Sequence, residues 1–426
     1  MIFRLLYDLS VSLYGLSIRI AAHFNPKAKK WIEGRKDWKK KLEEDLLSAQ
    51  AEKGKIIWLH AASVGEFEQG KPVLEALKDA YPNYKIAVSF FSPSGYEAAR
   101  GNTLADTIFY LPLDKPSNAK ALVEMLDPGL VVWMKYEYWW HHLEAIGKNG
   151  TPLLLVSAIF QERQPFFKWY GSWHRKMTQV FTHVFVQTTE SKELISSFFP
   201  VEKVTVSGDT RFDRVTKIAE KWSSIPLVEK WIGITEWVII AGSTWSDDEK
   251  LLRHIIRENK KVKWIIAPHK LDKQSLNETL AILPESLKYS DLEKNEELLD
   301  SDTNILLFDK MGFLSRLYKY GKICFIGGGF SATGIHNTLE ASVYGKPLVF
   351  GPEYEEYAEA VGLVSEGAAI PVENVLQLEK EIKVLLNDQQ YYEQCANKAH
   401  HFTQTHTGAT QTVLDFVYKN RLLTNA

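Results

Sequence analysis

The sequence of 426 residues has little cysteine, little net charge and no long apolar segment. Its two cysteines, Cys324 and Cys395, cannot form a disulfide framework, so we expect a reducing cytoplasmic environment. The formal net charge of −2 excludes the basic field with which a general nucleic-acid-binding protein displaces counterions, and we predict no nucleic-acid partner. No C-x-x-C or H-E-x-x-H spacing occurs, so we predict no protein-bound metal site.

The chain is too long for one ordinary core, and its 45% of apolar residues is enough for two. From Lys55 onward, short apolar segments alternate with helical ones. The expected strands are residues 56–60, 85–91, 107–110, 130–134, 152–157, 183–187 and 203–207, and, after a polar stretch at 214–235, residues 237–241, 262–267, 304–307, 322–326 and 347–350. Such repeated βα units predict two doubly wound, Rossmann-like α/β domains with parallel sheets, facing each other across a cleft.

The predicted organisation has three parts. Residues 1–45 form an amino-terminal helix with a basic collar, residues 46–220 a first Rossmann-like domain, and residues 221–426 a second one that ends in helices. In residues 1–24 the apolar positions recur at helical spacing opposite a narrow polar stripe, which predicts an amphipathic helix. Its longest uncharged run, residues 9–18, is much shorter than the roughly twenty residues that span a bilayer.

Many lysines follow this helix between residues 27 and 41. An apolar face joined to a basic collar is typical of a segment that lies on an anionic membrane surface. The alternative is a terminal helix that packs on its own domain, with the lysines facing water.

Residues 322–352 combine a buried strand, the triple glycine Gly327–Gly329, a polar helix start and a second strand. His336 and Asn337 are expected to open a helix that carries Glu340 one turn in. Glycines allow positive φ and a close approach to their amides, so this turn favours an anion at the carboxyl ends of the strands. A merely tight connection is the alternative.

Three charged residues follow strands of the first domain. Glu66 lies in the first turn of a helix, where an ordinary dipole-stabilised glutamate is the alternative. Glu137 follows another strand, among aromatic residues that exclude water, or it simply neighbours a helix cap. Arg211 follows the last strand of this domain and reaches into the cleft, unless it pairs with Asp209 or Asp213 at the surface.

Strand ends of the second domain carry further polar turns. They are the segments 242–244, 268–270 and 309–312. Each alone is consistent with simple helix capping, but their recurrence at the same end of one sheet predicts a shared nucleotide-type site.

The order of these motifs resembles the 3-deoxy-D-manno-octulosonic acid (Kdo) transferases of lipopolysaccharide biosynthesis, which are inverting glycosyltransferases of the GT-B architecture. The matching segments, up to about residue 372, are WLHAASVGE (58–66), EYW (137–139), GDTRFD (208–213), AGST (241–244), DKMG (309–312) and HNTLE (336–340). The resemblance implies CMP-Kdo as donor, a lipid A precursor (lipid IVA) as acceptor, no cofactor, and work at the cytoplasmic face of the inner membrane.

By the same resemblance Glu66 is the general base, and Glu137 and Arg211 stabilise charge in the transition state. The residues implied to contact CMP are Pro268, His269, Met311, Gly312, Phe313, Asn337, Thr338, Leu339 and Glu340. Another GT-B sugar-nucleotide transferase, a nucleotide-sugar epimerase and a non-enzymatic, membrane-tethered nucleotide-sugar binding protein are the alternatives. An epimerase has no use for the basic amphipathic start, and retention of all three charges disfavours a binding protein.

The sequence departs from the family pattern at four positions. The family usually has Arg at His269, His at Trp245, and Pro at Thr338 and Trp140. A neutral imidazole cannot clamp an anion as a guanidinium does, so His269 is the departure that bears on phosphate binding. The proline losses affect only turn geometry.

Overall fold

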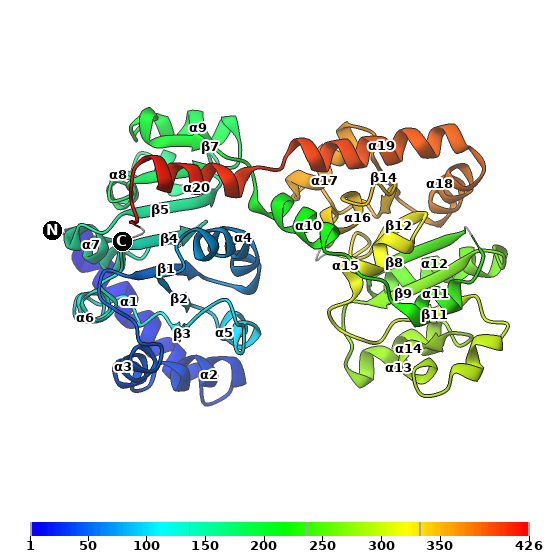
Figure 1. Cartoon of the computed structure of the whole chain (residues 1–426), viewed down its shortest axis with the longest axis horizontal. Coiled ribbons are helices and arrows are strands. Elements are labelled where there is room, and N and C mark those ends of the chain that lie inside the picture. The colour runs from blue at the N-terminus through cyan, green and yellow to red at the C-terminus, as the bar shows by residue number, and fades with distance from the viewer. Residues whose placement is uncertain (1, 136, 236, 332–333, 425–426) are drawn as a thin grey trace. The chain divides into compact units, whose positions relative to one another are not determined.

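The computed structural model describes residues 2–135, 137–235, 237–331 and 334–424. The chain forms two compact units, Met1–Arg214 with Thr407–Ala426, and Val215–His406. The first boundary lies close to the predicted one. The structure differs from the predicted division at the carboxyl end, because α20 (Ala409–Lys419) returns to the first unit, where the Phe416 ring lies 4.0 Å from that of His183 (Figure 1).

The sheet of the first unit has seven strands in the order β3-β2-β1-β4-β5-β6-β7, and every described pairing is parallel. The strands are β1 (Ile56–Ala61), β2 (Lys85–Phe90), β3 (Thr107–Tyr110), β4 (Leu130–Met134), β5 (Leu153–Ala158), β6 (His183–Val186) and β7 (Val204–Val206). The helices are α1 (Ile2–Ala21), α2 (Pro26–Arg35), α3 (Trp38–Ser48), α4 (Val64–Ala80), α5 (Pro93–Ala99), α6 (Pro116–Leu126), α7 (Trp140–Asn149), α8 (Ser172–Thr178) and α9 (Thr189–Ser196). Helix α10 (Thr210–Glu220) crosses the boundary between the units.

The sheet of the second unit also has seven strands, in the order β10-β11-β9-β8-β12-β13-β14. They are β8 (Val238–Thr244), β9 (Lys263–Pro268), β10 (Leu287–Lys288), β11 (Ile305–Leu307), β12 (Ile323–Ile326), β13 (Leu348–Phe350) and β14 (Ala369–Pro371). The helices are α11 (Pro226–Ile232), α12 (Ser246–Glu258), α13 (Lys273–Ile282), α14 (Tyr289–Leu292), α15 (Leu314–Leu317), α16 (Leu339–Ser342), α17 (Ala358–Ser365), α18 (Val375–Asn387) and α19 (Gln389–Thr405). The two predicted parallel α/β sheets are confirmed. The short strands β10 and β14 were not predicted.

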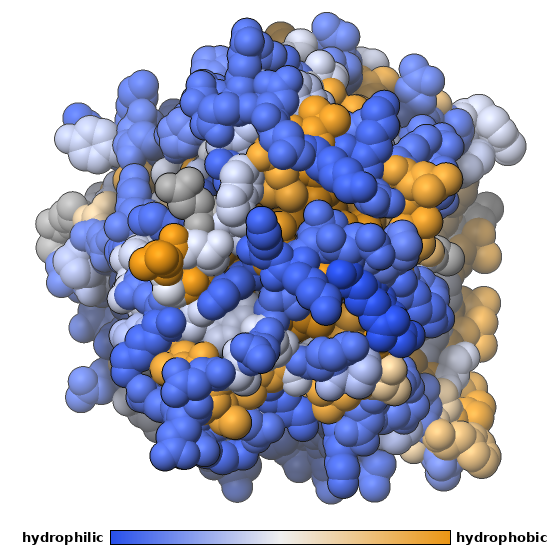
Figure 2. All heavy atoms as spheres, turned by 90° about the vertical axis from the view of Figure 1, so that its right-hand side faces the viewer, coloured by the Kyte–Doolittle hydropathy of each residue, from blue (hydrophilic) through white to orange (hydrophobic). Residues whose placement is uncertain are grey.

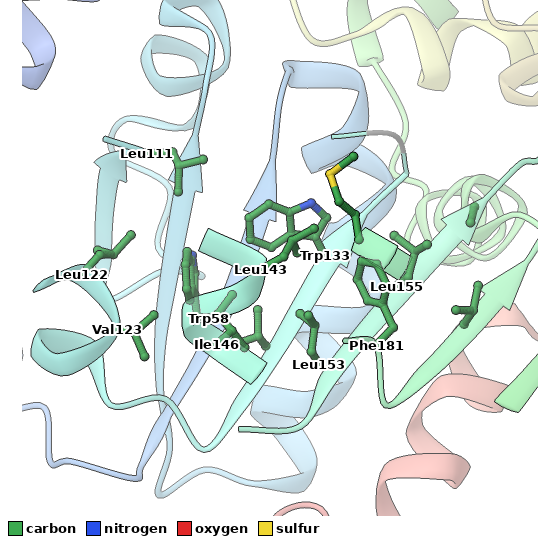
Figure 3. Packing of buried hydrophobic residues seen from close by; sticks show 14 of the residues in the cluster. Trp58, Leu111, Leu122, Val123, Trp133, Leu143, Ile146, Leu153, Leu155 and Phe181 are labelled. Carbon is green, nitrogen blue, oxygen red and sulfur yellow. The ribbon is translucent and has the colours of Figure 1, made fainter. Parts of the chain in front are cut away.

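Both faces of the first sheet are buried, which explains why its strands are continuous apolar segments. On one face Trp58 and Trp133 meet edge to face at 5.9 Å, covered by apolar residues of α6 and α7 (Figure 3). Residues of α4 and α20 cover the other face. Burial of Trp58 and Trp133 fixes the neighbouring strands β1 and β4, whose carboxyl ends lead into the candidate site.

The surface of the second unit that faces the viewer in Figure 2 is mostly hydrophilic, with small separate apolar groups. Such scattered apolar residues are normal for a water-exposed surface. The first unit differs at α1, where Leu9, Leu13 and Ile20 are each more than half exposed.

The other side of α1 packs on the first unit. The Tyr7 hydroxyl donates to Asp114 Oδ2 at 2.5 Å, and His141 Nε2 lies 2.5 Å from Asp8 Oδ1. The helix therefore has both a docked side and an exposed apolar side. Among the helices of the described residues, none combines the length and the apolar character that crossing a bilayer requires.

Candidate functional site

Glu66 is the third residue of α4, which begins directly after β1 and its N-cap Ser63. One of its carboxylate oxygens, Oε2, accepts the amide N–H of Ala62. Burial raises the pKa of Glu66 to about 7, and the charge of Glu137 raises it further, whereas the Ala62 amide lowers it. Desolvation therefore outweighs the helix-start effect that normally keeps such a pKa low. A carboxyl group with this pKa is well suited to exchange protons near neutral pH.

Glu137 follows β4 and is held by two ring N–H groups. Its Oε2 lies 2.8 Å from His60 Nε2 and 2.9 Å from Trp139 Nε1. The Trp133 indole N–H donates to the Glu137 carbonyl at 2.5 Å, which fixes the backbone as well. The strand ends of β1 and β4 thus bring together Glu137 and the Glu66 whose pKa it raises, as the sequence predicted for one end of the sheet.

His60 is a member of this site that the sequence did not single out. It is fully buried, and its ring lies 4.1 Å from that of Trp133. Its Nδ1 is 2.9 Å from Ser89 Oγ, which also accepts the Trp58 indole N–H at 2.8 Å. The network is satisfied when His60 carries its proton on Nε2, donates it to Glu137 and accepts the Ser89 hydroxyl. The available signal was a histidine at the carboxyl end of a buried strand.

Arg211 pairs with Asp209 in this structure, which is the surface ion pair that the sequence left as an alternative. The distance from Arg211 Nε to Asp209 Oδ2 is 2.8 Å. The other Asp209 oxygen accepts the Gln69 side-chain amide at 3.0 Å. Because Gln69 lies on α4, this bond ties the loop of Arg211 to the helix that carries Glu66.

In the second unit the predicted nucleotide-site residues follow β9, β11 and β12, which lie on the same side of β14 in one parallel sheet. Their side chains therefore emerge at the same end of that sheet. The structure also brings together three rings that are distant in sequence: Trp245, His269 and His336. The His269 ring lies 4.8 Å from Trp245 and 4.2 Å from His336 in stacked geometry.

This three-ring stack is neutral at physiological pH. Burial lowers the pKa of His336 to about 4, and burial also lowers the pKa of His269. The Trp245 indole donates to His336 Nε2 at 3.0 Å, so the His336 proton lies on Nδ1. Two of the departures from the family pattern, Trp245 and His269, are therefore in contact, and together they make an aromatic surface where the family has cationic and imidazole groups.

The triple glycine does not offer the anion site that we expected from the sequence. The Gly327 amide donates to the Gly242 carbonyl, and the Gly328 amide donates to Asp248 Oδ2 at 2.9 Å, so both are occupied. Gly328 has φ +96, and an added Cβ at Gly327 would lie 2.4 Å from the Ser243 carbonyl oxygen. The glycines are needed for close packing of strand ends, which was the alternative interpretation.

The helix predicted to open at His336 is shorter than expected and comprises Leu339–Ser342. Asn337 precedes it and caps it, since its Oδ1 accepts the Leu339 amide at 3.0 Å. The Asn337 side-chain amide also donates to Glu340 Oε1 at 3.2 Å. Thr338 and Leu339 are fully buried, which leaves Asn337 and Glu340 as the half-buried polar side chains of this motif.

The loop after β11 carries the other predicted CMP contacts. Met311 is 85% exposed, and Gly312 has φ +85, which favours glycine there. Phe313 is half-buried, with its ring 5.5 Å from that of Phe308. Pro268 ends β9 directly before His269. In the described part of the chain, no group of three or more His, Cys, Asp or Glu side chains has an arrangement that could hold a metal ion.

Comparisons with known proteins extend over most of the chain. Residues 36–214 match the family described as 3-Deoxy-D-manno-octulosonic-acid transferase (kdotransferase). A bifunctional glycosyltransferase/methyltransferase of Fusobacterium nucleatum is 28% identical over 82% of this chain, which spans only 55% of that relative. The 3-deoxy-D-manno-octulosonic acid transferases of Haemophilus influenzae and Aquifex aeolicus are 24% and 28% identical, over 85% and 78% of this chain and 86% of each relative.

Solved structures agree on the fold. UDP-GlcNAc 2-epimerase from Neisseria meningitidis is similar with a TM-score of 0.61 at 15% identity, covering 85% of this chain and all (100%) of that one. MurG from Acinetobacter baumannii is similar with a TM-score of 0.51 at 15% identity, covering 86% of this chain and 99% of that one. At such low identity these likenesses establish the two-domain GT-B type of α/β fold and no more.

Proposed function

We propose, on the premise that this chain is a relative of the 3-deoxy-D-manno-octulosonic acid transferases, that it is a glycosyltransferase that moves Kdo from CMP-Kdo to a lipid A precursor (lipid IVA). The family match and the relatives confirm the resemblance that the motifs predicted. The proposal for the reaction rests on one observation above all: the buried carboxyl group of Glu66, with its pKa at about 7, beside Glu137.

In the proposed reaction Glu66 acts as general base. An acceptor hydroxyl transfers its proton to the Glu66 carboxylate as its oxygen attacks the anomeric carbon of Kdo. The bond from that carbon to the CMP phosphate oxygen breaks with inversion, and CMP leaves with the electron pair. A base whose pKa lies near the working pH serves this step best, because it is both partly ionised and sufficiently basic.

Glu137 and Arg211 supply fixed charge around this step. Glu137 faces the positive charge that develops on the sugar ring, and His60 is a positioning residue that keeps this carboxylate in place through the 2.8 Å bond. Arg211 offsets the negative charge of the leaving phosphate. Its present bond to Asp209 holds it ready and orients its guanidinium.

The donor nucleotide is proposed to bind at the strand ends of the second unit. Asn337 and Glu340 offer hydrogen bonds to the nucleotide, and the Met311–Phe313 loop offers backbone groups, with Pro268 beside them. Because the three-ring stack is neutral, His269 contributes a hydrogen bond or an aromatic surface and no charge. Phosphate binding here therefore depends less on ionic clamping than it does in a site with an arginine.

An anionic membrane surface is the proposed location, at the cytoplasmic face of the inner membrane. The exposed apolar side of α1 and the lysines after it support this, because together they suit a helix that lies in the lipid headgroup region. The acceptor is itself a lipid, so such attachment brings the enzyme to its substrate.

The test is a transfer assay with the full-length protein, CMP-Kdo and a tetraacyl lipid A precursor, read out by product mass. We expect a product heavier by one or more Kdo residues, which does not form when the acceptor is omitted. Consumption of CMP-Kdo that needs no acceptor, or a turnover that requires a different sugar nucleotide, would contradict the proposal. The control variant Asp79→Asn removes an exposed carboxylate from the same helix as Glu66 and should be fully active.

A further inference from the structure

A pocket of about 510 Å³ opens in the first unit beside α1, away from Glu66 and Glu137. Residues of α1, of α2 and the start of α3, and of the loop before α6 line it. Its apolar lining consists of Leu16, Trp31, Ile32, Trp38 and Leu113. A volume of this size accommodates part of a lipid or another small amphiphile.

The charged groups of this pocket are almost all cationic. Arg19, Arg35, Lys36 and Lys115 line it, against one carboxylate, Glu33. Glu33 already has a partner, because Lys29 Nζ lies 3.8 Å from it one helical turn away. None of the four lining cations has a carboxylate within ion-pair distance among the residues that the structure describes. The pocket therefore presents an apolar wall with uncompensated positive charge.

Arg35 is the most constrained of these cations. It donates to the carbonyl groups of Leu111 at 2.8 Å, Phe91 at 2.7 Å and Trp31 at 3.2 Å, and its guanidinium lies 3.7 Å from the Trp31 ring centre. Burial lowers the pKa of Arg35 to about 9, so the group stays cationic at neutral pH. A cation that remains partly buried without a carboxylate partner is costly, and a bound anion would offset that cost.

The pocket lies next to the exposed apolar side of α1. Leu16, at 52% exposure, belongs both to that side and to the pocket lining, and Leu13 and Ile20 flank it. If α1 lies at a membrane surface, as proposed above, the pocket mouth meets the level of the phosphate groups. An acyl chain then meets Leu16 and Leu113, and the phosphate meets the lysines.

We propose that this pocket binds one anionic phospholipid, with its phosphate among Arg19, Lys36 and Lys115 and the start of one acyl chain against Leu16 and Leu113. The proposal rests on the membrane location given under the proposed function, and not on the transfer reaction. It differs from general attraction to a charged surface because it requires one saturable site of defined stoichiometry.

The test uses a phosphatidylglycerol with six-carbon chains, which stays monomeric in solution and so offers no membrane surface. Calorimetry with the full-length protein should show saturable binding of one lipid per chain, and at least tenfold weaker binding of the phosphatidylcholine with the same chains. The double variant Lys36→Gln, Lys115→Gln should bind the anionic lipid about 30-fold more weakly, from the loss of two lysines near its charge. The matched control Lys41→Gln, Lys53→Gln removes the same charge from exposed positions outside the pocket and should bind normally.

Three results would overturn the proposal. They are the absence of saturable binding, equal losses in both double variants, and equal binding of the two lipids. A competition arm distinguishes the other source of a lipid phosphate. If the soluble bisphosphorylated disaccharide of the acceptor displaces the short phospholipid, the pocket belongs to the acceptor and the assignment to a phospholipid is wrong. Because the readout is binding, a failure here is distinct from a failure of Kdo transfer.

Discussion

Glu66→Gln should make the protein more stable at alkaline pH while it abolishes most of the activity. The folded carboxyl has a pKa of about 7, against the usual 4.5. Between these values the folded protein holds a proton that the unfolded chain has released, so stability falls as pH rises through this window and the full cost applies above it. At about 1.4 kcal/mol for each pKa unit, ionised Glu66 costs about 3 kcal/mol. Glutamine keeps an oxygen for the Ala62 amide and carries no charge.

The assay is urea unfolding of the wild type and of Glu66→Gln at pH 5 and pH 8. The stability advantage of the variant should grow by about 2 kcal/mol between these two pH values, because the charged form of Glu66 is populated only at the higher one. Asp79→Asn, on the same helix but exposed, should show no such growth. An advantage for Glu66→Gln that is absent or independent of pH would refute the argument that burial raises the pKa of this carboxyl.

Further expectations concern the donor site, His60 and α1. Glu340→Ala should weaken CMP binding by about 1–3 kcal/mol, the usual consequence of losing a hydrogen bond to a charged group, and calorimetry with a folded variant that shows unchanged affinity would remove Glu340 from the site. Trp245→Phe keeps the stacking but removes the N–H bond to His336, so NMR titration should find the His336 pKa above its present value of about 4; an unchanged pKa would mean that burial alone sets it. His60→Ala should lower turnover and leave CMP affinity intact, whereas equal effects on both would indicate general misfolding. Leu9→Gln with Leu13→Gln should release the protein from anionic vesicles, and co-sedimentation equal to that of the wild type would place attachment elsewhere.

The last of these replaces a simpler experiment. Deletion of residues 1–24 seemed from the sequence to remove an anchor and leave the domains intact. In the structure it would also remove the partners of Asp114 and His141, which Tyr7 and Asp8 provide. Because buried polar groups without partners are destabilising, the deletion tests folding as well as attachment. Substitutions on the exposed side of α1 avoid that problem.

The strands and the positions of the charged motifs were predictable from the sequence, since buried parallel strands are short apolar segments that end at polar turns. Glu66 and Glu137 could be placed at one end of a sheet for that reason. The bond between His60 and Glu137 could not be predicted, because it joins residues 77 positions apart through the pairing of β1 with β4. The pKa of Glu66 also depends on burial by the whole fold and not on its place in a helix.

Local sequence misled where a second segment takes up the group in question. The amides of the triple glycine looked available, but Asp248, 80 positions before Gly328, accepts one of them. His269 looked like a weakened phosphate ligand, and the structure shows it stacked between Trp245 and His336. The return of α20 to the first unit depends on packing of Val413 and Val417 into a core that forms from distant strands. Each of these follows from tertiary contacts that no local pattern encodes.

The pH dependence of kcat/KM for Kdo transfer tests the central claim most directly. If Glu66 is the general base, the rate with CMP-Kdo and the lipid A precursor should rise through a midpoint near pH 7, the pKa of the folded carboxyl, and then level off. Glu66→Gln should be slower by at least roughly a hundredfold and should lack this rise. A wild-type rate that is already level above pH 5, or a Glu66→Gln enzyme with near-normal turnover, would contradict the account and move the base to another residue, with Glu137 the next to test.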